Sequence, residues 1–383
     1  MKKTLCLILT IIIFTSILLA MLLSCTDSVF ALSAMRAILI DTASGKVLME
    51  KDAYTKAPMA STTKIMTALI ALELGNPDDI VIVSDNAAET EGSSMWLSSG
   101  EHIALRDLTY GLMLNSGNDA ATAIAEHIAG DVSGFAVLMN KRATEIGAKD
   151  TNFTNPHGLD DENHYTTAYD LALITRTALQ NTEFAQIVAT KSKSVSWEGK
   201  EWGRTLQNHN KMLTMYDGAD GVKTGFTKRT GRCLVSSATR GSMQLIAVTL
   251  NAPDDWTDHT SMLNFGFTNY SNKSVITAET VIKTIYCENS DSSYIPVVPQ
   301  EGYSMILKND NTSDQVTMQH DLPDTISAPI LKGQEIGTLY VYVNNIEEVV
   351  IPLISVVDAD KTAPAKISFC DKFWYLIECI TTF

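Results

Sequence analysis

Cysteine is scarce in this chain of 383 residues, and the six cysteines are scattered. They stand at positions 6, 25, 233, 287, 370 and 379. So few and so distant cysteines do not make a disulfide framework in a domain of this size. The chain also has no Cys-x-x-Cys and no His-x-x-x-His, the spacings typical of protein-bound transition metals. We therefore expect no disulfide scaffold, no metal site and no cofactor.

Positive charge is also in short supply. The chain has 29 Lys and Arg against 44 Asp and Glu, a formal net charge of −15. Nucleic-acid phosphates demand a basic face, so no nucleic-acid partner is expected. Charge alone would not bind the chain to an anionic membrane either. Repeats and low-complexity tracts are absent, and hydrophobic residues make up 45% of the chain. A chain of this length and composition folds into globular domains and has room for two.

The N-terminus carries the pattern of an export signal, assigned to residues 1–31. Two lysines precede a nearly unbroken apolar run from Leu5 to Leu23. Cleavage after Ala31 is one processing route. Leu22-Leu-Ser-Cys25 resembles a lipoprotein box and gives a second route, with a lipidated cysteine at the new N-terminus. Retention of the apolar run as an anchor is a third. We expect the mature protein at the outer face of the cytoplasmic membrane or in the cell wall.

Helix and strand patterns alternate over residues 35–270. A β-hairpin is predicted at residues 37–40 and 46–49, and paired strands at 232–238 and 243–251. Apolar residues at helical spacing predict helices at residues 65–74, 105–114, 119–129, 135–146 and 167–179. Around Tyr270 the helical runs stop. Short β-branched segments separated by Pro, Asn and Gly then predict an all-β domain at residues 275–358.

The last segment, residues 366–383, has a different character. Polar side chains fall on one narrow arc of a predicted helix, and Phe373 and Trp374 belong to the wide apolar remainder. A helix over residues 367–383 would be about 25 Å long, short of the roughly 30 Å hydrocarbon core. We expect it to lie on the membrane surface. The alternative is a helix that packs on the β-domain.

Three short motifs follow one another in one order: Ser61-Thr-Thr-Lys64, Ser116-Gly-Asn118 and Lys223-Thr-Gly225. Each alone is common by chance. The literal Ser84-Asp-Asn86 comes too soon after the first motif, whereas Ser116-Gly-Asn118 leaves room for a long helix and a covering loop. In this order and on an exported chain, the three motifs together indicate a serine acyltransferase.

The residue types suit that chemistry. A serine hydroxyl such as that of Ser61 needs a base within hydrogen-bond reach, and Lys64, one turn along the same helix, can supply it. A lysine works as a base only when it is desolvated or lies near other positive charge. Lys223 could provide that charge. Ser116 can relay a proton to the leaving nitrogen, and Asn118 offers an amide to Lys64 or to the substrate.

Backbone groups complete the predicted site. Ser61 is expected at a helix N-terminus, where N–H groups are unpaired. With the backbone N–H that follows Gly225, that of Phe226, these groups can form an oxyanion hole. Taken singly, each residue also has an ordinary structural interpretation. Ser61 could be an N-cap, Lys64 a solvated first-turn lysine, and Asn118 a turn residue.

With their flanking residues, the motifs resemble the low-molecular-mass penicillin-binding proteins of the D-alanyl-D-alanine carboxypeptidase family, serine peptidases like penicillin-binding protein 5. The matching segments span residues 35–357. They are Ala60-Ser-Thr-Thr-Lys-Ile-Met-Thr67, Gly92-Ser-Ser-Met95, Asn115-Ser-Gly-Asn-Asp-Ala120, Asn155-Pro-His-Gly-Leu159, Tyr165-Thr-Thr-Ala-Tyr-Asp-Leu-Ala172, Asp220-Gly-Val-Lys-Thr-Gly225 and Ala328-Pro-Ile-Leu-Lys-Gly-Gln334. The resemblance implies an α+β fold. A β-lactamase/transpeptidase-like catalytic domain, an antiparallel sheet with flanking helices, would precede a C-terminal all-β domain.

The resemblance also implies a reaction, the removal of the terminal D-alanine from peptidoglycan pentapeptides through an acyl-enzyme on Ser61. The implied partners are peptidoglycan stem peptides, with β-lactam antibiotics as covalent inhibitors of the same serine. Lys223 and Thr224 are the implied carboxylate site. Two positions depart from the family pattern. Phe226 stands where some members carry His, so its side chain is not expected to tune the site, although its backbone N–H still can. His209 stands where some carry Arg, so carboxylate binding is expected to be weaker or pH-dependent.

Two other functions stay open at this point. One is a β-lactamase of the same fold, although no Glu-x-x-x-Asn stands in a recognisable loop between Asn118 and Lys223. The other is a catalytically dead scaffold that binds peptidoglycan. Some neighbouring residues invite other interpretations. We expect His157 and His164 to belong to a structural loop, not to a metal site. Trp96 either lines the cleft or packs in the core.

Overall fold

The computed structural model describes residues 31–310 and 313–362, which divide into two compact units between Phe267 and Thr268. Nearly all of the expected export signal and the whole of segment 366–383 lie outside the described residues. Among the described residues, no helix is both long enough and apolar enough to cross a membrane. Each unit is described by itself.

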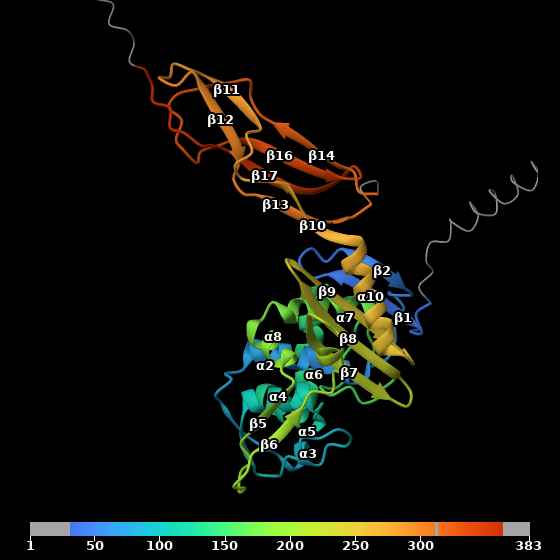
Figure 1. Ribbon diagram of the computed structural model, residues 1–383. Helices are drawn as coiled ribbons and strands as arrows, with labels where there is room; N and C mark the ends of the chain where they lie inside the picture. The colour runs from blue at the N-terminus through green and yellow to red at the C-terminus, as the bar shows by residue number, and fades with distance from the viewer. Residues whose placement is uncertain (1–30, 311–312, 363–383) are drawn as a thin grey trace, which may run out of the picture. The chain divides into compact units, whose positions relative to one another are not determined.

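The first unit combines helices with strands (Figure 1). Its strands are β1 (Arg36–Asp41), β2 (Val47–Lys51), β3 (Ile80–Ile82), β4 (His102–Ala104), β5 (Ser192–Val195), β6 (Arg204–Gln207), β7 (Ala219–Thr227), β8 (Gly231–Arg240) and β9 (Met243–Leu250). Its helices are η1 (Ala60–Thr63), α2 (Lys64–Leu74), α3 (Asp85–Ala88), α4 (Leu105–Leu114), α5 (Asn118–Ala129), α6 (Val132–Ile146), α7 (Ala168–Leu179), α8 (Thr182–Ala189), α9 (Met212–Met215) and α10 (Asp255–Asn269).

A five-stranded antiparallel sheet organises this unit, in the order β2-β1-β9-β8-β7. Alternation along β1 explains why both faces are covered. Ile38 and Ile40 join the main core with the helices, while Leu39 points to the other face. There Gly266 of α10 comes so close to Leu39 and Leu245 that a Cβ would overlap the Leu245 side chain. Strand β7, which carries Lys223-Thr-Gly225, is an edge strand of the sheet.

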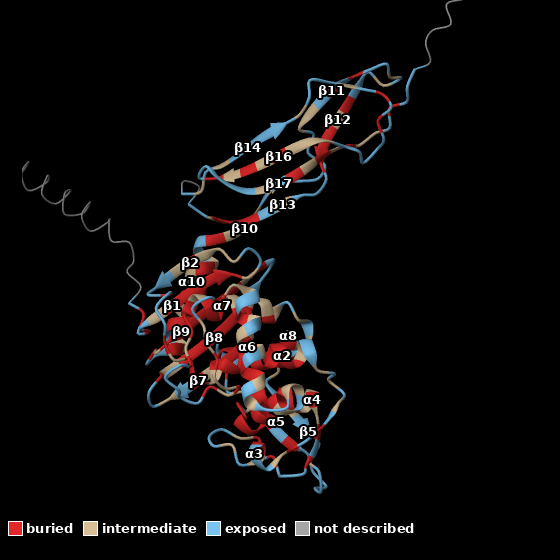
Figure 2. Cartoon of the chain, turned by 180° about the vertical axis from the view of Figure 1, so that it is seen from behind, coloured by how far each residue is buried: buried red, intermediate tan, exposed pale blue. Residues whose placement is uncertain are grey.

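Helix α2 lies in the middle of the main core. All eight residues from Lys64 to Ala71 are buried, as expected for a helix that is apolar almost all round. It contacts α4, α5, α6, α7 and α8. Figure 2 shows its buried surface among the other helices. A lysine therefore begins a helix that has no solvent-facing side until its last turn.

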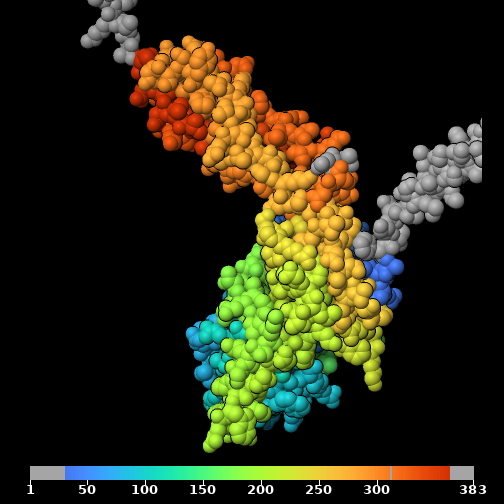
Figure 3. All heavy atoms as spheres, in the orientation of Figure 1, coloured from blue at the N-terminus to red at the C-terminus, as the bar shows by residue number. Residues whose placement is uncertain are grey.

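The two ends of the first unit, far apart in the sequence, are joined by hydrogen bonds. The backbone N–H groups of Ser33 and Ala34 donate to the carboxylate of Asp258, 225 and 224 residues later, at 2.9 and 2.8 Å. In Figure 3 the atoms of the first strands (blue) lie beside those of α10 (amber). The start of the described chain is thus fixed against the last helix of the unit.

Within residues 270–310 and 313–362, the regular elements of the second unit are all strands. They are β10 (Tyr270–Ile276), β11 (Lys283–Glu288), β12 (Tyr294–Pro299), β13 (Tyr303–Lys308), β14 (Val316–Asp321), β15 (Thr325–Ser327), β16 (Glu335–Val343) and β17 (Ile346–Ser355). Strands β10 and β13 pair with each other, and the other six form the sheet β14-β16-β17-β12-β11-β15. Leu339, Val341 and Ile351 belong to its core, whereas β14 is almost wholly exposed (Figure 2). The expected all-β C-terminal region is confirmed.

Most of the predicted elements are also confirmed, with two differences in detail. Ser61 lies in the 3₁₀ turn η1 that precedes α2, and Thr63 is the residue before the α-helix proper. Helix α6 begins at Val132, three residues before the predicted start. The reason is a cap, since the Asp131 side chain accepts a hydrogen bond from the Gly134 backbone N–H at 2.6 Å.

Candidate active site

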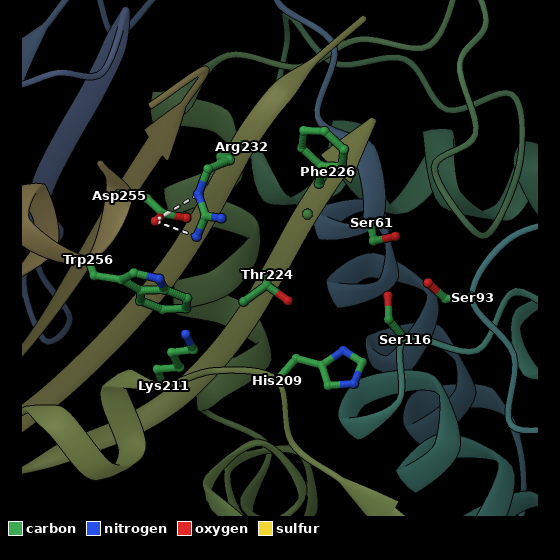
Figure 4. Close-up of a pocket in the computed structure, with 11 residues that line it drawn as sticks. Ser61, Ser93, Ser116, His209, Lys211, Thr224, Phe226, Arg232, Asp255 and Trp256 are labelled. Atoms are coloured by element: carbon green, nitrogen blue, oxygen red, sulfur yellow. Dashed lines mark hydrogen bonds and ion pairs between the residues drawn. The ribbon is translucent and has the colours of Figure 1, made fainter. Parts of the chain in front are cut away.

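An open cleft of about 370 Å³ brings the motifs together. Figure 4 shows Ser61, Ser93 and Ser116 gathered at one end and Thr224 and His209 in the middle. The cleft is lined by Ser61, Ser93, Ser116, His209, Lys211, Thr224, Gly225, Phe226, Arg232, Asp255 and Trp256. Its lining comes from η1, the loops before β4, α5 and α9, the edge strand β7, its neighbour β8 and the start of α10.

The side chain of Lys64 lies within hydrogen-bond distance of Ser61. Its Nζ atom is 3.1 Å from Ser61 Oγ, 2.7 Å from Asn118 Oδ1 and 2.7 Å from the backbone oxygen of His157. The Asn118 amide is itself oriented, because its Nδ2 donates to the Glu91 carbonyl at 2.6 Å. The amide oxygen therefore has to face the lysine.

Burial makes Lys64 a candidate base. The side chain is wholly buried, and this desolvation lowers its pKa well below the usual value. The positive charge of Lys223 lowers the pKa further, while Asp119 opposes the shift. Burial also lowers the pKa of Lys223, to about 7. The charge of Lys223, when present, thus favours the neutral form of Lys64.

Lys223 lies behind the cleft wall and is not one of its lining residues. It is 1% exposed, and its Nζ donates to the backbone oxygen of Thr224 at 2.9 Å. Thr224, Gly225 and Phe226 form the wall itself. Gly225 permits a close approach, since a Cβ there would lie 3.1–3.2 Å from the backbone atoms Met59 O, Thr62 N and Ser61 N. Strand β7 therefore runs along η1 beside Ser61.

The backbone is strained at two residues of the site, one directly before Ser61 in the chain and one in the loop before α5. Ala60 and Ser116 have φ values of +48° and +59°, in the left-handed region that non-glycine residues rarely adopt. Surrounding hydrogen bonds hold the segment with Ser116, since the Asn118 N–H donates to Ser93 O at 2.6 Å. Asp119, buried, accepts from the N–H groups of Met95 and Leu97. Strain of this kind is characteristic of functional sites.

Comparison with known proteins identifies the family to which the chain belongs. Residues 24–254 match the family described as D-alanyl-D-alanine carboxypeptidase, and residues 270–361 match the C-terminal domain of penicillin-binding protein 5. The chain belongs to the D-alanyl-D-alanine carboxypeptidase family. The first match alone covers more than half of the chain.

Individual members of the carboxypeptidase family are similar over most of their length. The chain is 35% identical over 322 residues to D-alanyl-D-alanine carboxypeptidase DacF from Bacillus subtilis, covering 82% of each. It is 32% identical over 317 residues to DacC from Escherichia coli, covering 79% of this chain and 78% of that protein. The structure of penicillin-binding protein 5 from Haemophilus influenzae superposes with a TM-score of 0.69 at 29% identity. That match covers 86% of this chain and 98% of the other.

Several lining residues of this carboxypeptidase-family cleft were not predicted from the sequence. Arg232 Nη2 and Nε lie 2.7 and 3.0 Å from Asp255 Oδ1, and the guanidinium lies 5.7 Å from the Trp256 ring. Lys211 joins them at the end of the cleft away from Ser61 (Figure 4). A hairpin register could have indicated Arg232, because it pairs with Phe226 across β7 and β8. No local pattern indicated Asp255 and Trp256, which begin a helix 28 residues after β7 ends.

The remaining candidates separate clearly. His209 lines the cleft, and burial, with a smaller effect of Lys223, lowers its pKa. Trp96 neither lines the cleft nor packs in the core, being 71% exposed, whereas its neighbour Met95 is buried. His157 and His164 belong to no cluster of metal-ligating side chains within the described residues. Cys233 is buried in β8, as expected of a small core residue.

Proposed function

We propose that this carboxypeptidase-family protein removes the terminal D-alanine from peptidoglycan stem pentapeptides through an acyl-enzyme on Ser61. The observation that carries the proposal is the set of three partners around Lys64 Nζ. Two of them, Asn118 Oδ1 and His157 O, can only accept hydrogen bonds. The third is the hydroxyl of Ser61, which can also donate.

This set of partners gives the neutral lysine a defined orientation. A neutral amine has two N–H bonds and one lone pair. The two carbonyl oxygens take the two N–H bonds, so the lone pair faces the Ser61 hydroxyl. Lys64 then accepts the Ser61 proton as Oγ attacks the carbonyl carbon of the scissile amide. The lowered pKa of Lys64 supports this role, because it increases the share of free base near neutral pH.

Proton delivery and charge stabilisation complete the acylation step. Ser116 lies at the same end of the cleft as Ser61 and would carry the proton from Lys64 to the leaving nitrogen (Figure 4). The backbone N–H groups of Ser61 and Phe226 would bind the developing oxyanion. The close passage of Gly225 along η1 supports this pairing. Such a donor contributes on the order of 3–4 kcal/mol. Water would then hydrolyse the ester and regenerate Ser61.

The terminal carboxylate of the peptide would bind at the cationic part of the cleft. Thr224 offers a hydroxyl there, and Arg232 offers a guanidinium held in place by Asp255. Lys223 would act from behind the wall, through its charge, since it does not line the cleft. A cationic cleft on a chain of net charge −15 also favours the approach of anionic peptides to this one region.

The two alternative functions have weaker support. A β-lactamase of this fold needs a carboxylate that activates water beside the acyl-serine. Asp255 is the single carboxylate that lines the described cleft, and it is ion-paired with Arg232 at the end away from Ser61 (Figure 4). A dead scaffold would have no need to retain an oriented Lys64 and Asn118. Family membership also favours the carboxypeptidase.

For the location, we propose an exported protein held at the membrane surface by residues 366–383. The apolar run near the N-terminus and the substrate class support export. The aromatic, wide apolar face expected of the C-terminal segment supports an interfacial position.

β-Lactam antibiotics would acylate Ser61 as substrate analogues.

Incubation of the protein with fluorescent penicillin, followed by a denaturing gel, tests the proposed function. A covalently labelled band is expected from either enzyme and excludes the dead scaffold. Rates of D-alanine release from a pentapeptide and of nitrocefin turnover then separate the two enzymes. The proposal requires D-alanine release to be the faster reaction, and rapid nitrocefin turnover without D-alanine release would overturn it.

A further inference from the structure

A buried histidine that the proposed mechanism does not use lies next to η1. His164 is 3% exposed and follows the turn that contains His157. Its Nε2 atom is 2.8 Å from Thr63 Oγ1. Its Nδ1 atom accepts from the backbone N–H of Thr154 at 3.0 Å. The Phe153 ring packs against it edge-on, with ring centroids 5.8 Å apart.

These contacts fix the proton on one ring nitrogen. The Thr154 backbone N–H can only donate, so Nδ1 has to be the acceptor. The ring proton of the neutral imidazole is then on Nε2 and is donated to Thr63 Oγ1. Thr63 passes the chain of hydrogen bonds on, because its own hydroxyl donates to Ala60 O at 2.8 Å. Each polar atom of this chain therefore has one role.

Burial keeps the His164 ring neutral near pH 7. Burial lowers its pKa to about 4. Asp161 and Asp160, on the same loop, act in the opposite direction, and Lys64 of α2 adds to the lowering. His157, the neighbouring titratable group, is also neutral at this pH, since burial and Lys64 lower its pKa to about 3. The single tautomer is thus present throughout the neutral range.

The hydrogen bonds of His164 connect two chain segments that position Lys64. Thr63 immediately precedes Lys64 and ends the turn that carries Ser61. Thr154 leads into the turn whose His157 carbonyl accepts from Lys64 Nζ. The two segments are in direct contact, because a Cβ on Gly158, whose φ is +88°, would overlap the Ala60 carbonyl. His164 therefore joins the segment with the nucleophile to the segment with an acceptor for the base.

We propose that His164 is a positioning residue, which sets the place of Ser61 and Lys64 through its Nε2–H···Oγ1 hydrogen bond to Thr63. The inference rests on the proposed role of Ser61 and Lys64. Acylation depends steeply on the Oγ–Nζ geometry, and a misplacement of about 1 Å can cost on the order of 10²-fold in rate. Loss of the bond should therefore slow acylation without weakening the initial non-covalent binding, because His164 does not line the cleft.

Two substitutions distinguish the hydrogen bond made by Nε2 from the one made by Nδ1. Asn places its amide where Nδ1 lies, so His164→Asn keeps an acceptor for the Thr154 N–H and loses the donor to Thr63. Gln places its amide where Nε2 lies, so His164→Gln keeps the donor to Thr63. Each variant loses one buried hydrogen bond, worth on the order of 1 kcal/mol. Their stabilities are therefore comparable, while their predicted activities differ.

The measurement is the acylation of Ser61 by fluorescent penicillin, resolved into an initial binding constant and an acylation rate constant per folded protein. We expect His164→Asn to lower the rate constant by about 10-fold to 10²-fold with unchanged binding. His164→Gln should stay within about threefold of the unchanged protein. Thr63→Val also loses the hydrogen bond to the Ala60 carbonyl, so it should be at least as slow as the Asn variant, and the double variant should be no slower than Thr63→Val alone.

A matched control is available in the same unit. His259 is also buried and has its Nε2 atom 2.9 Å from a threonine hydroxyl, that of Thr249. His259→Asn should lower the unfolding temperature without changing the acylation rate constant of the folded protein. Equal rates for His164→Asn and His164→Gln, or additive effects of Thr63→Val and His164→Asn, would overturn the inference. Absence of label on the unchanged protein would instead overturn the proposed function.

Discussion

Lys64 and Lys223 are both buried, and the charge of Lys223 lowers the pKa of Lys64. Lys64, whose pKa is lowered well below its usual value, is suited to be neutral, and Lys223, with a pKa of about 7, carries its charge below that pH. The neutral one faces Ser61, with its two N–H bonds taken by carbonyl oxygens. The charged one lies behind the wall that lines the cleft. The division explains how a lysine can serve as the base next to an anionic substrate, and it leads to measurable consequences.

The first prediction concerns pH. Lys223, with a pKa of about 7, carries its charge below that value and loses it as the pH rises. If the charge helps to bind the terminal carboxylate, kcat/KM for a peptide ending in D-Ala-D-Ala should fall as the pH rises through about 7. The same peptide with an amidated C-terminus lacks the carboxylate and should show no such fall. Parallel pH profiles for the two peptides would contradict a role of Lys223 in carboxylate binding.

The second prediction concerns the base. Lys64→Arg keeps a positive charge, but a guanidinium does not give up its proton near pH 7. Acylation by fluorescent penicillin should fall by on the order of 10²-fold or more. Thermal unfolding should be recorded alongside, because the larger side chain enters a fully buried site. Near-normal acylation of a folded Lys64→Arg protein would place the base elsewhere.

The third prediction concerns Arg232, which lines the cleft where Lys223 does not. Arg232→Gln removes a charged donor and should raise KM for peptides with a free carboxylate by about tenfold or more. Amidated peptides should be affected far less. Arg232→Lys retains the positive charge, which can still pair with Asp255, and serves as the matched control. Equal losses for free and amidated peptides would assign Arg232 a purely structural role.

The fourth prediction concerns the C-terminal segment. The processed protein should pellet with lipid vesicles and stay bound in high salt, because charges in residues 366–383 nearly balance and apolar burial provides the affinity. Truncation after Ala365 should release the protein and leave activity on soluble peptides intact. If the truncated protein still pellets, the anchor is the lipidated Cys25 or an uncleaved signal. If neither form pellets, the membrane role of the segment is wrong.

Local patterns predicted much of the fold and most of the motif residues at the site. Helix α2 and strand β9 are apolar segments that are largely buried, and both were predicted close to their observed bounds. The motifs indicated Ser61 and Ser116 because acyl transfer needs those residue types together, and the family resemblance implied Thr224. The structure places these three residues in the lining of one cleft.

What local patterns missed arises from tertiary contacts. The backbone carbonyl of His157 is an acceptor for Lys64 only because the turn after Thr154 packs on η1. No residue type marks such a carbonyl in a sequence. Asp255 likewise reaches the cleft because α10 begins beside β8, where Arg232 lies. The buried position of Lys223 behind Thr224 also depends on the packing of the edge strand, so its lack of exposure could not be inferred.

The most direct test of the account is Ser61→Ala, assayed for both D-alanine release and covalent labelling by fluorescent penicillin. The substitution removes one hydroxyl and leaves Lys64, Asn118 and the cleft in place. We predict that the unchanged protein releases D-alanine and takes up the label, and that Ser61→Ala does neither while retaining its folded structure by circular dichroism. Covalent label or D-alanine release that persists in Ser61→Ala would contradict the assignment of Ser61 as the nucleophile.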